Sequence, residues 1–214
     1  MEFKECIIES FKIIEKSTNC EQLEDWEKEL KNKLDKKNFI DIKKYPRIAF
    51  RFNDEDLDYF RDESNQELAS LIGSSNDLKL TPREKLMLSM LWKNGDLGKE
   101  KHIINGLLNK DHEKSKKTGQ IFHQFGRKLK SPDKEPIIDQ HILRAFKYYQ
   151  NTSNTGEYAY SEHFSKQNSK AISDYKDWIT ENVLANKPNP EDYLYYTDRI
   201  LFGIGKYLKP YLKK

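Results

Sequence analysis

The chain has 214 residues, of which 36% are hydrophobic and 34% charged, and its formal net charge is +3. This length and apolar content suit one globular unit, and no apolar run approaches the roughly 20 residues that a membrane-spanning helix needs. The first residues mix acids into their apolar positions, unlike a secretory signal, so we expect a cytoplasmic protein without membrane contact.

Apolar residues recur at helical spacing along most of the chain, which predicts an all-α fold. Two helices are expected in the first 35 residues, separated by a break at 17–19. Later helices are expected at about 54–72, 81–93, 99–109, 117–130, 140–149, 168–184 and 190–209. Turn residues at 73–76 indicate a boundary between two lobes.

Two of these helices carry clear start patterns. Thr81 and Glu84 have the spacing of a capping box, and Pro82 suits the first helical turn. Asn189 precedes Pro190 and two acids, which predicts a capped N-terminus there as well. The last helix and the residues after it combine tyrosines with lysines, which suits either a packed lobe or a nucleic-acid surface.

Charge is unevenly distributed along the chain. Residues 54–67 carry seven acids and one base, whereas residues 114–130 carry six bases and no acid. A strip of lysines and arginines without opposing acids is what a polyphosphate partner requires, because neutralising phosphates releases counterions. A solvated helix face is the plainer explanation of the same strip.

Metal chemistry is not expected from this sequence. Cys6 and Cys20 lack Cys-x-x-Cys spacing and are too few for an iron–sulfur cluster. The histidines form no pair at helical spacing and none stands beside a cysteine ligand. We therefore expect no metal and no cofactor.

The most informative stretch is 117–146. Residues 136–141 read Pro-Ile-Ile-Asp-Gln-His, which places Asp139 at the start of a helix, 22 residues after Lys117. With the polar connection at 109–118 and the helices beside it, residues 80–150 resemble the helix-hairpin-helix DNA glycosylases, especially the 8-oxoguanine DNA glycosylase branch. The resemblance implies a hairpin that holds a DNA phosphate, a lysine nucleophile in bifunctional members, and an essential aspartate, here Asp139.

The chemistry of base excision suits these residue types. Breaking the bond between deoxyribose and base develops positive charge on the sugar, which a sheltered carboxylate stabilises. A neutral lysine that attacks the sugar carbon gives a Schiff base instead, and strand cleavage by elimination can follow. The neighbouring Lys114 and Lys116, together with a helix N-terminus, disfavour the charged form of Lys117.

The family's hairpin usually carries a hydrophobic–Gly–hydrophobic–Gly signature, whereas residues 109–119 contain one glycine, Gly119. Either Lys116 or Lys117 can therefore open the next helix, and lysine side chains would replace glycine-exposed backbone in holding phosphate. The residues expected to bind DNA are Lys114, Lys116, Thr118, Gly119 and Arg127.

Several neighbours of these residues have two interpretations. His141 and Gln140 would support catalysis, and Phe122 or Phe125 would stack on a base extruded from the duplex. The plainer alternatives are a helix N-cap for Asp139, a satisfied core histidine for His141, and core packing for both phenylalanines.

The sequence thus predicts a two-lobed, monomeric, all-α protein. Residues 80–150 would form the glycosylase-like lobe, residues 1–79 and 151–214 the second lobe, and a cleft between them would hold the extruded base. The expected reaction is excision of a damaged or modified base from double-stranded DNA, in repair or in defence against phage DNA with modified bases. A non-catalytic DNA-binding module and a protein–protein adaptor are the alternatives.

Overall fold

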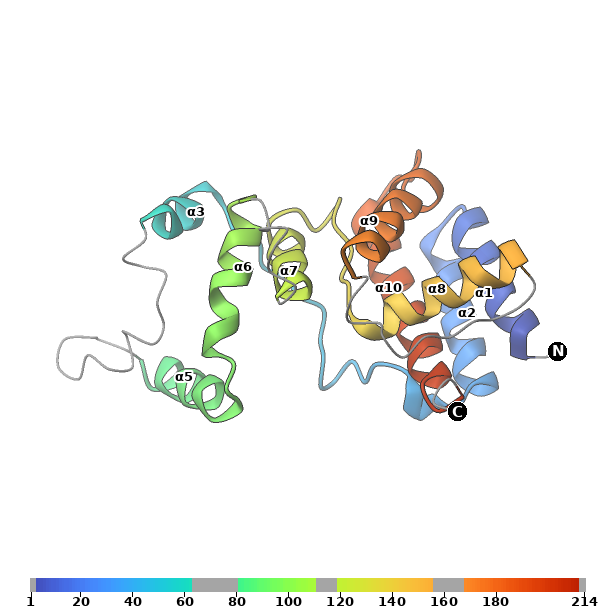
Figure 1. The fold of residues 1–214 in the computed structure, drawn as a ribbon, viewed down its shortest axis with the longest axis horizontal. Coiled ribbons are helices and arrows are strands. Elements are labelled where there is room, and N and C mark those ends of the chain that lie inside the picture. Colours follow the sequence, from blue (N-terminus) through green and yellow to red (C-terminus); the bar gives the residue numbers. More distant parts are fainter. Residues whose placement is uncertain (1–2, 63–80, 111–118, 156–167, 212–214) are drawn as a thin grey trace. The chain divides into compact units, whose positions relative to one another are not determined.

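The computed structural model describes residues 3–62, 81–110, 119–155 and 168–211 (Figure 1). Within them the chain forms nine α-helices and no strand, so the expected all-α fold is confirmed. None of the helices in these ranges is long and apolar enough to cross a membrane.

The chain divides into two compact units. Unit 1 comprises residues 1–49 and 132–214, and unit 2 comprises residues 50–131. The lobe expected at 80–150 therefore includes parts of both units, with Asp139 in unit 1 and the connection at 109–118 in unit 2.

Unit 1 is a bundle in which the C-terminal helix packs against both α8 and α2 (Figure 1). Its α-helices are α1 (Phe3–Lys16), α2 (Cys20–Lys33), α8 (Gln140–Thr155), α9 (Asn168–Trp178) and α10 (Pro190–Leu208). A short 3-10 helix, η1 (Lys36–Asn38), follows α2, and a π-helical turn, η5 (Ile179–Val183), follows α9. The apolar faces of these helices form one continuous core.

The break between the first two helices lies where the sequence places it. Asn19 caps α2 by accepting a hydrogen bond from the Gln22 N–H at 3.1 Å. Asn189 also occupies an N-cap position, before α10, but its side chain makes no capping hydrogen bond. The expected side-chain cap is therefore wrong there, whereas Pro190 does open the helix.

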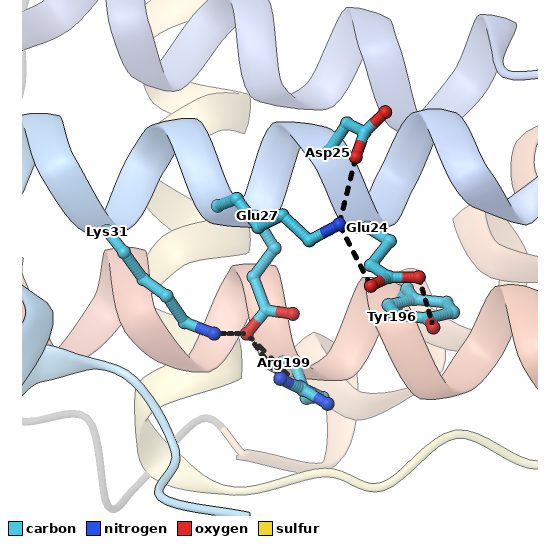
Figure 2. A network of polar contacts seen from close by, with 7 residues as sticks. Glu24, Asp25, Glu27, Lys31, Tyr196 and Arg199 are labelled. Atoms are coloured by element: carbon cyan, nitrogen blue, oxygen red, sulfur yellow. Dashed lines mark hydrogen bonds and ion pairs between the residues drawn. The ribbon is translucent and has the colours of Figure 1, made fainter.

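A buried ion-pair network joins α2 to α10 (Figure 2). The carboxylate of Glu27 is almost completely buried and accepts from Arg199 through Nε at 3.1 Å and Nη2 at 2.8 Å. Lys31 adds an ion pair to the same oxygen at 2.8 Å, and Tyr196 donates to Glu24 at 3.1 Å. Two cations on one buried carboxylate compensate for its removal from water, so the pair fixes how α2 meets α10.

Unit 2 has a smaller core built from Leu57, Leu107 and Leu129. Its helices are α3 (Asp54–Arg61), α5 (Pro82–Asn94), α6 (Glu100–Leu107) and α7 (Gln120–Lys130), with the 3-10 helix η3 (Leu97–Lys99) before α6. The helix expected at 54–72 ends at Arg61, because Asp62 has an extended backbone, so the expected end at 72 is wrong; residues 63–80 lie outside the described ranges.

The start of α5 follows the sequence pattern. Glu84 accepts from the Thr81 N–H at 2.7 Å while Thr81 accepts from the Glu84 N–H, which completes the expected capping box around Pro82. Nevertheless, none of the residues of α5 is buried, and four of its large apolar side chains are exposed: Leu86, Met87, Met90 and Trp92, the last at 64%. The capping box therefore locates the start of α5 but does not indicate that the helix is buried.

The helices α6 and α7 approach each other through two glycines. A Cβ built on Gly106 would overlap the carbonyl oxygen of His123, and one built on Gly126 would overlap that of Ile103. The pair is tight because both positions lack side chains. Each glycine therefore acts as a spacer of fixed size between the two helices.

We expect Gly126→Ala to destabilise unit 2 by about 2 kcal/mol, because the new methyl group meets backbone that cannot move aside cheaply. Gly98→Ala is the matched control, since nothing lies within 4 Å of its Cβ position. Urea unfolding followed by circular dichroism measures both variants. Equal stability of the two would contradict the close approach of α6 and α7.

We expect Glu27→Gln to lower the free energy of unfolding by about 3 kcal/mol, because it leaves Arg199 buried without its counter-charge. Glu29→Gln, on the same helix, removes an exposed carboxylate paired with Lys33, and its cost should stay below about 1 kcal/mol. Parallel denaturant titrations compare the two variants. A cost for Glu27→Gln no larger than that for Glu29→Gln would show that the network contributes little.

Candidate functional site around Asp139

Asp139 lies directly before α8 and caps it. Its Oδ1 accepts hydrogen bonds from the backbone N–H groups of His141 at 2.7 Å and Ile142 at 2.8 Å. The predicted helix start at Asp139 is therefore confirmed, and so is its capping role. In the described part of the chain, no hydrogen bond or ion pair engages Oδ2, and the side chain is half-buried.

A second carboxylate holds the segment that leads to Asp139. Asp198 on α10 is 5% exposed, and its Oδ2 accepts from the Ile137 N–H at 2.9 Å. Its Oδ1 accepts from the Tyr175 hydroxyl at 3.4 Å. Ile138 is buried in the unit 1 core, so both backbone and side chain anchor the two residues before Asp139.

The hydroxyl of Tyr175 remains protonated in this environment. Complete burial raises its pKa well above the ordinary value, and the nearby charges of Asp198 and Asp139 add to the shift. The phenol therefore donates a hydrogen bond to Asp198 at any physiological pH. Sequence reasoning missed both residues; the one available pattern was an aspartate on the apolar face of the last helix.

The side chain of His141, on α8, packs against α10. Nη1 of Arg144 lies 2.8 Å from Nδ1 of His141 and also donates to the Gly205 carbonyl at 2.8 Å. Because a guanidinium group donates and does not accept, Nδ1 of His141 is the acceptor. The ring also meets Phe202 edge to face, with centroids 4.9 Å apart.

The surroundings of His141 favour its neutral form. Burial is the largest cause that lowers its pKa, and the positive charges of Arg144 and Lys209 lower it further. The charge of Asp139 and a backbone hydrogen bond to Gly205 oppose this shift without cancelling it. His141 therefore fits the plainer interpretation, a satisfied core histidine, and a catalytic part for it stays a prediction. Gln140, expected beside it, is exposed as the first residue of α8.

The remaining expected site residues belong to unit 2. Gly119 has a left-handed backbone, with φ of 87°, and is the N-cap of α7. The helix therefore begins at Gln120, and the expected start at 117 is wrong, because Gly119 is not helical. Lys114, Lys116, Lys117 and Thr118 lie outside the described residues, and their roles stay predictions.

Phe122, Phe125 and Arg127 are half-buried on α7. Phe125 packs against the unit 2 core, in line with its plainer interpretation. The Lys99 ammonium lies 4.9 Å from the centroid of the Phe122 ring, so this ring carries a cation on one face. At the base of the connection, Nε2 of His123 donates to the Lys110 carbonyl at 2.8 Å.

No protein-family model matches this chain, and neither a curated protein nor a solved structure does. In the described ranges, no group of three or more His, Cys, Asp or Glu residues is placed to hold a metal ion. At Asp139, one carboxylate oxygen is fixed by the cap, and the other makes no hydrogen bond among the described residues.

The lowered pKa of His141 predicts a pH dependence of stability. Its folded pKa lies below the ordinary value of 6.5, so protonation favours the unfolded chain. The stabilisation is complete above that value and is lost as pH falls below it. We expect the free energy of unfolding to drop more in the wild type than in His141→Gln between about pH 7.5 and about pH 5.5. The effect is ruled out if the free energy of unfolding falls equally in both proteins over this pH range.

Proposed function

We propose that this protein is a DNA N-glycosylase in which Asp139 is the essential carboxylate. The observation that carries the proposal is the anchoring of Asp139: two backbone N–H groups hold Oδ1, and Asp198 fixes the residues before it. A carboxylate fixed in this way can stabilise developing charge without first reorganising.

Such a carboxylate suits the chemistry of base excision. As the bond between base and sugar breaks, the electron pair leaves with the base and positive charge builds on the deoxyribose. Oδ2 of Asp139 would face that charge and orient the water that replaces the base. The base has to leave the duplex stack before it can be reached. The substrate is then a damaged or chemically modified base in double-stranded DNA.

Lys117 is the proposed nucleophile of a bifunctional reaction. Its neutral amine would attack the sugar carbon as the base leaves with the bonding electron pair. Loss of the amine protons and breaking of the bond from that carbon to the ring oxygen, which takes up a proton, would then give a Schiff base that permits strand cleavage by elimination. The proposal for Asp139 does not require this step, since a water molecule can serve as the nucleophile. The biological role would be base-excision repair or defence against phage DNA that carries modified bases.

One observation favours a non-catalytic DNA-binding module instead. The two capping hydrogen bonds alone give Asp139 a structural purpose, since aspartate is a favoured N-cap in any helix. Both functions include DNA binding, so binding by itself does not separate them. Base release separates them, provided that the variant tested keeps the cap.

Asp139→Asn is the decisive substitution, because asparagine caps helices as well as aspartate does but carries no charge. We expect it to leave folding and duplex affinity nearly unchanged while base release falls by at least about 100-fold. The measurement is release of free base from duplexes with oxidised, deaminated, alkylated or phage-type modified bases. Asp139→Ala serves as the structural control, with a loss of about 1 kcal/mol from the missing cap.

Three outcomes would contradict the proposal. Unchanged base release by Asp139→Asn would exclude the carboxylate from the chemistry. Tight DNA binding without base release from any duplex would favour the non-catalytic module, and the absence of DNA binding would favour a protein–protein adaptor.

Borohydride trapping tests the lysine separately. We expect a trapped protein–DNA adduct that Lys117→Gln abolishes and the matched Lys116→Gln retains, because reduction captures only the Schiff base of the attacking amine. Loss of the adduct in Lys116→Gln alone would shift the nucleophile by one residue. Base release without any adduct would mean that water is the nucleophile.

A further inference from the structure

Lysines gather at the C-terminal end of α10, where it meets η1. The Lys206 ammonium donates to the Lys37 carbonyl at 3.1 Å, which brings the two segments together. Lys36, Lys37 and Lys209 are exposed. We call these four lysines the α10 basic edge.

The charge of this edge is only partly compensated. The Lys37 ammonium lies 2.7 Å from a carboxylate oxygen of Asp35, and the Asp35 side chain is half-exposed. The bond of Lys206 goes to a neutral carbonyl rather than to a carboxylate. The end of α10 contributes a partial negative charge that favours lysines there but does not neutralise them. A positive surface therefore remains.

Two tyrosines border the edge. Tyr207 and Tyr211 stack with centroids 5.1 Å apart, and their hydroxyls lie 3.2 Å from each other. That hydrogen bond and partial burial raise the pKa of Tyr207 to about 12. Tyr211 is 58% exposed. The Tyr207 phenol therefore stays neutral at physiological pH.

The α10 basic edge lies on the same unit as Asp139 and near it. Gly205 touches the His141 backbone so closely that a Cβ on it would overlap the His141 carbonyl. Lys206 lies over the Phe202 ring, at 5.8 Å from its centroid, and that ring meets His141. The positive charge of Lys209 also lowers the pKa of His141. Asp139 is two residues before His141, so Lys206 and Lys209 lie beside the start of the helix that Asp139 caps.

We propose that the α10 basic edge binds the DNA phosphates that flank the nucleotide held at Asp139. This inference rests on the proposed function in naming DNA as the partner. Lysine side chains suit a phosphate track that carries no sequence preference, since each contributes a point charge and three donors. The edge also gives unit 1 a DNA contact of its own, independent of the lysines at 114–117.

The test is the salt dependence of binding to an unmodified fluorescent duplex by the full chain. Lys206→Ala/Lys209→Ala should weaken binding roughly tenfold or more at about 0.1 M salt, since two phosphate contacts are lost. The slope of log K against log salt should become shallower by about two. Lys206→Arg/Lys209→Arg keeps the charge and should bind like the wild type.

A matched control removes the same charge elsewhere on unit 1. Lys12 and Lys16 are exposed on the second half of α1. Lys12→Ala/Lys16→Ala should retain both affinity and slope. Circular dichroism confirms that each double variant is folded.

Each outcome decides the inference. It is overturned if the alanine variant binds like the wild type, if the control weakens equally, or if the wild type does not bind duplex DNA. Base release, measured in parallel, decides the catalytic proposal separately. Weakened binding without any base release from the wild type would uphold the basic edge and remove the catalytic role of Asp139. Base release with unchanged binding by the alanine variant would do the reverse.

Discussion

The crossing of α8 and α10 sets the position of the candidate site. At Gly205 the two helices meet backbone to backbone, and Arg144 ties the Gly205 carbonyl to the His141 ring. Nearer the start of α10, Asp198 accepts from the Ile137 N–H and so fixes the segment that ends at Asp139. The capped carboxylate therefore owes its place to α10 as well as to the helix that it opens.

Local pattern predicted much of this fold. Helical spacing and start patterns located the break at Asn19, the capping box at Thr81 and the cap at Asp139, because each depends on residues a few positions apart. The start of α7 was misplaced for an equally local reason. Gly119 adopts a left-handed backbone that the lysine-rich run before it did not reveal.

Long-range contacts could not be predicted in the same way. An aspartate on the apolar face of the last helix does not indicate which group it binds, and its partner Ile137 lies 61 residues away in the sequence. Glycine spacing likewise did not indicate that Gly205 would touch the backbone of α8. The start pattern at Thr81 located α5 but did not indicate that Leu86, Met87, Met90 and Trp92 would be exposed, because a capping box depends only on residues within one helical turn.

In the proposed reaction, Asp139 uses its two oxygens differently, Oδ1 for the helix and Oδ2 for chemistry. A crystal structure of the wild type bound to a duplex with an uncleavable, positively charged sugar analogue tests this most directly. The account predicts that Oδ1 keeps its bonds to His141 and Ile142 while Oδ2 contacts the charged ring. DNA bound with the ring away from Asp139, and the carboxylate serving only as a cap, would contradict it.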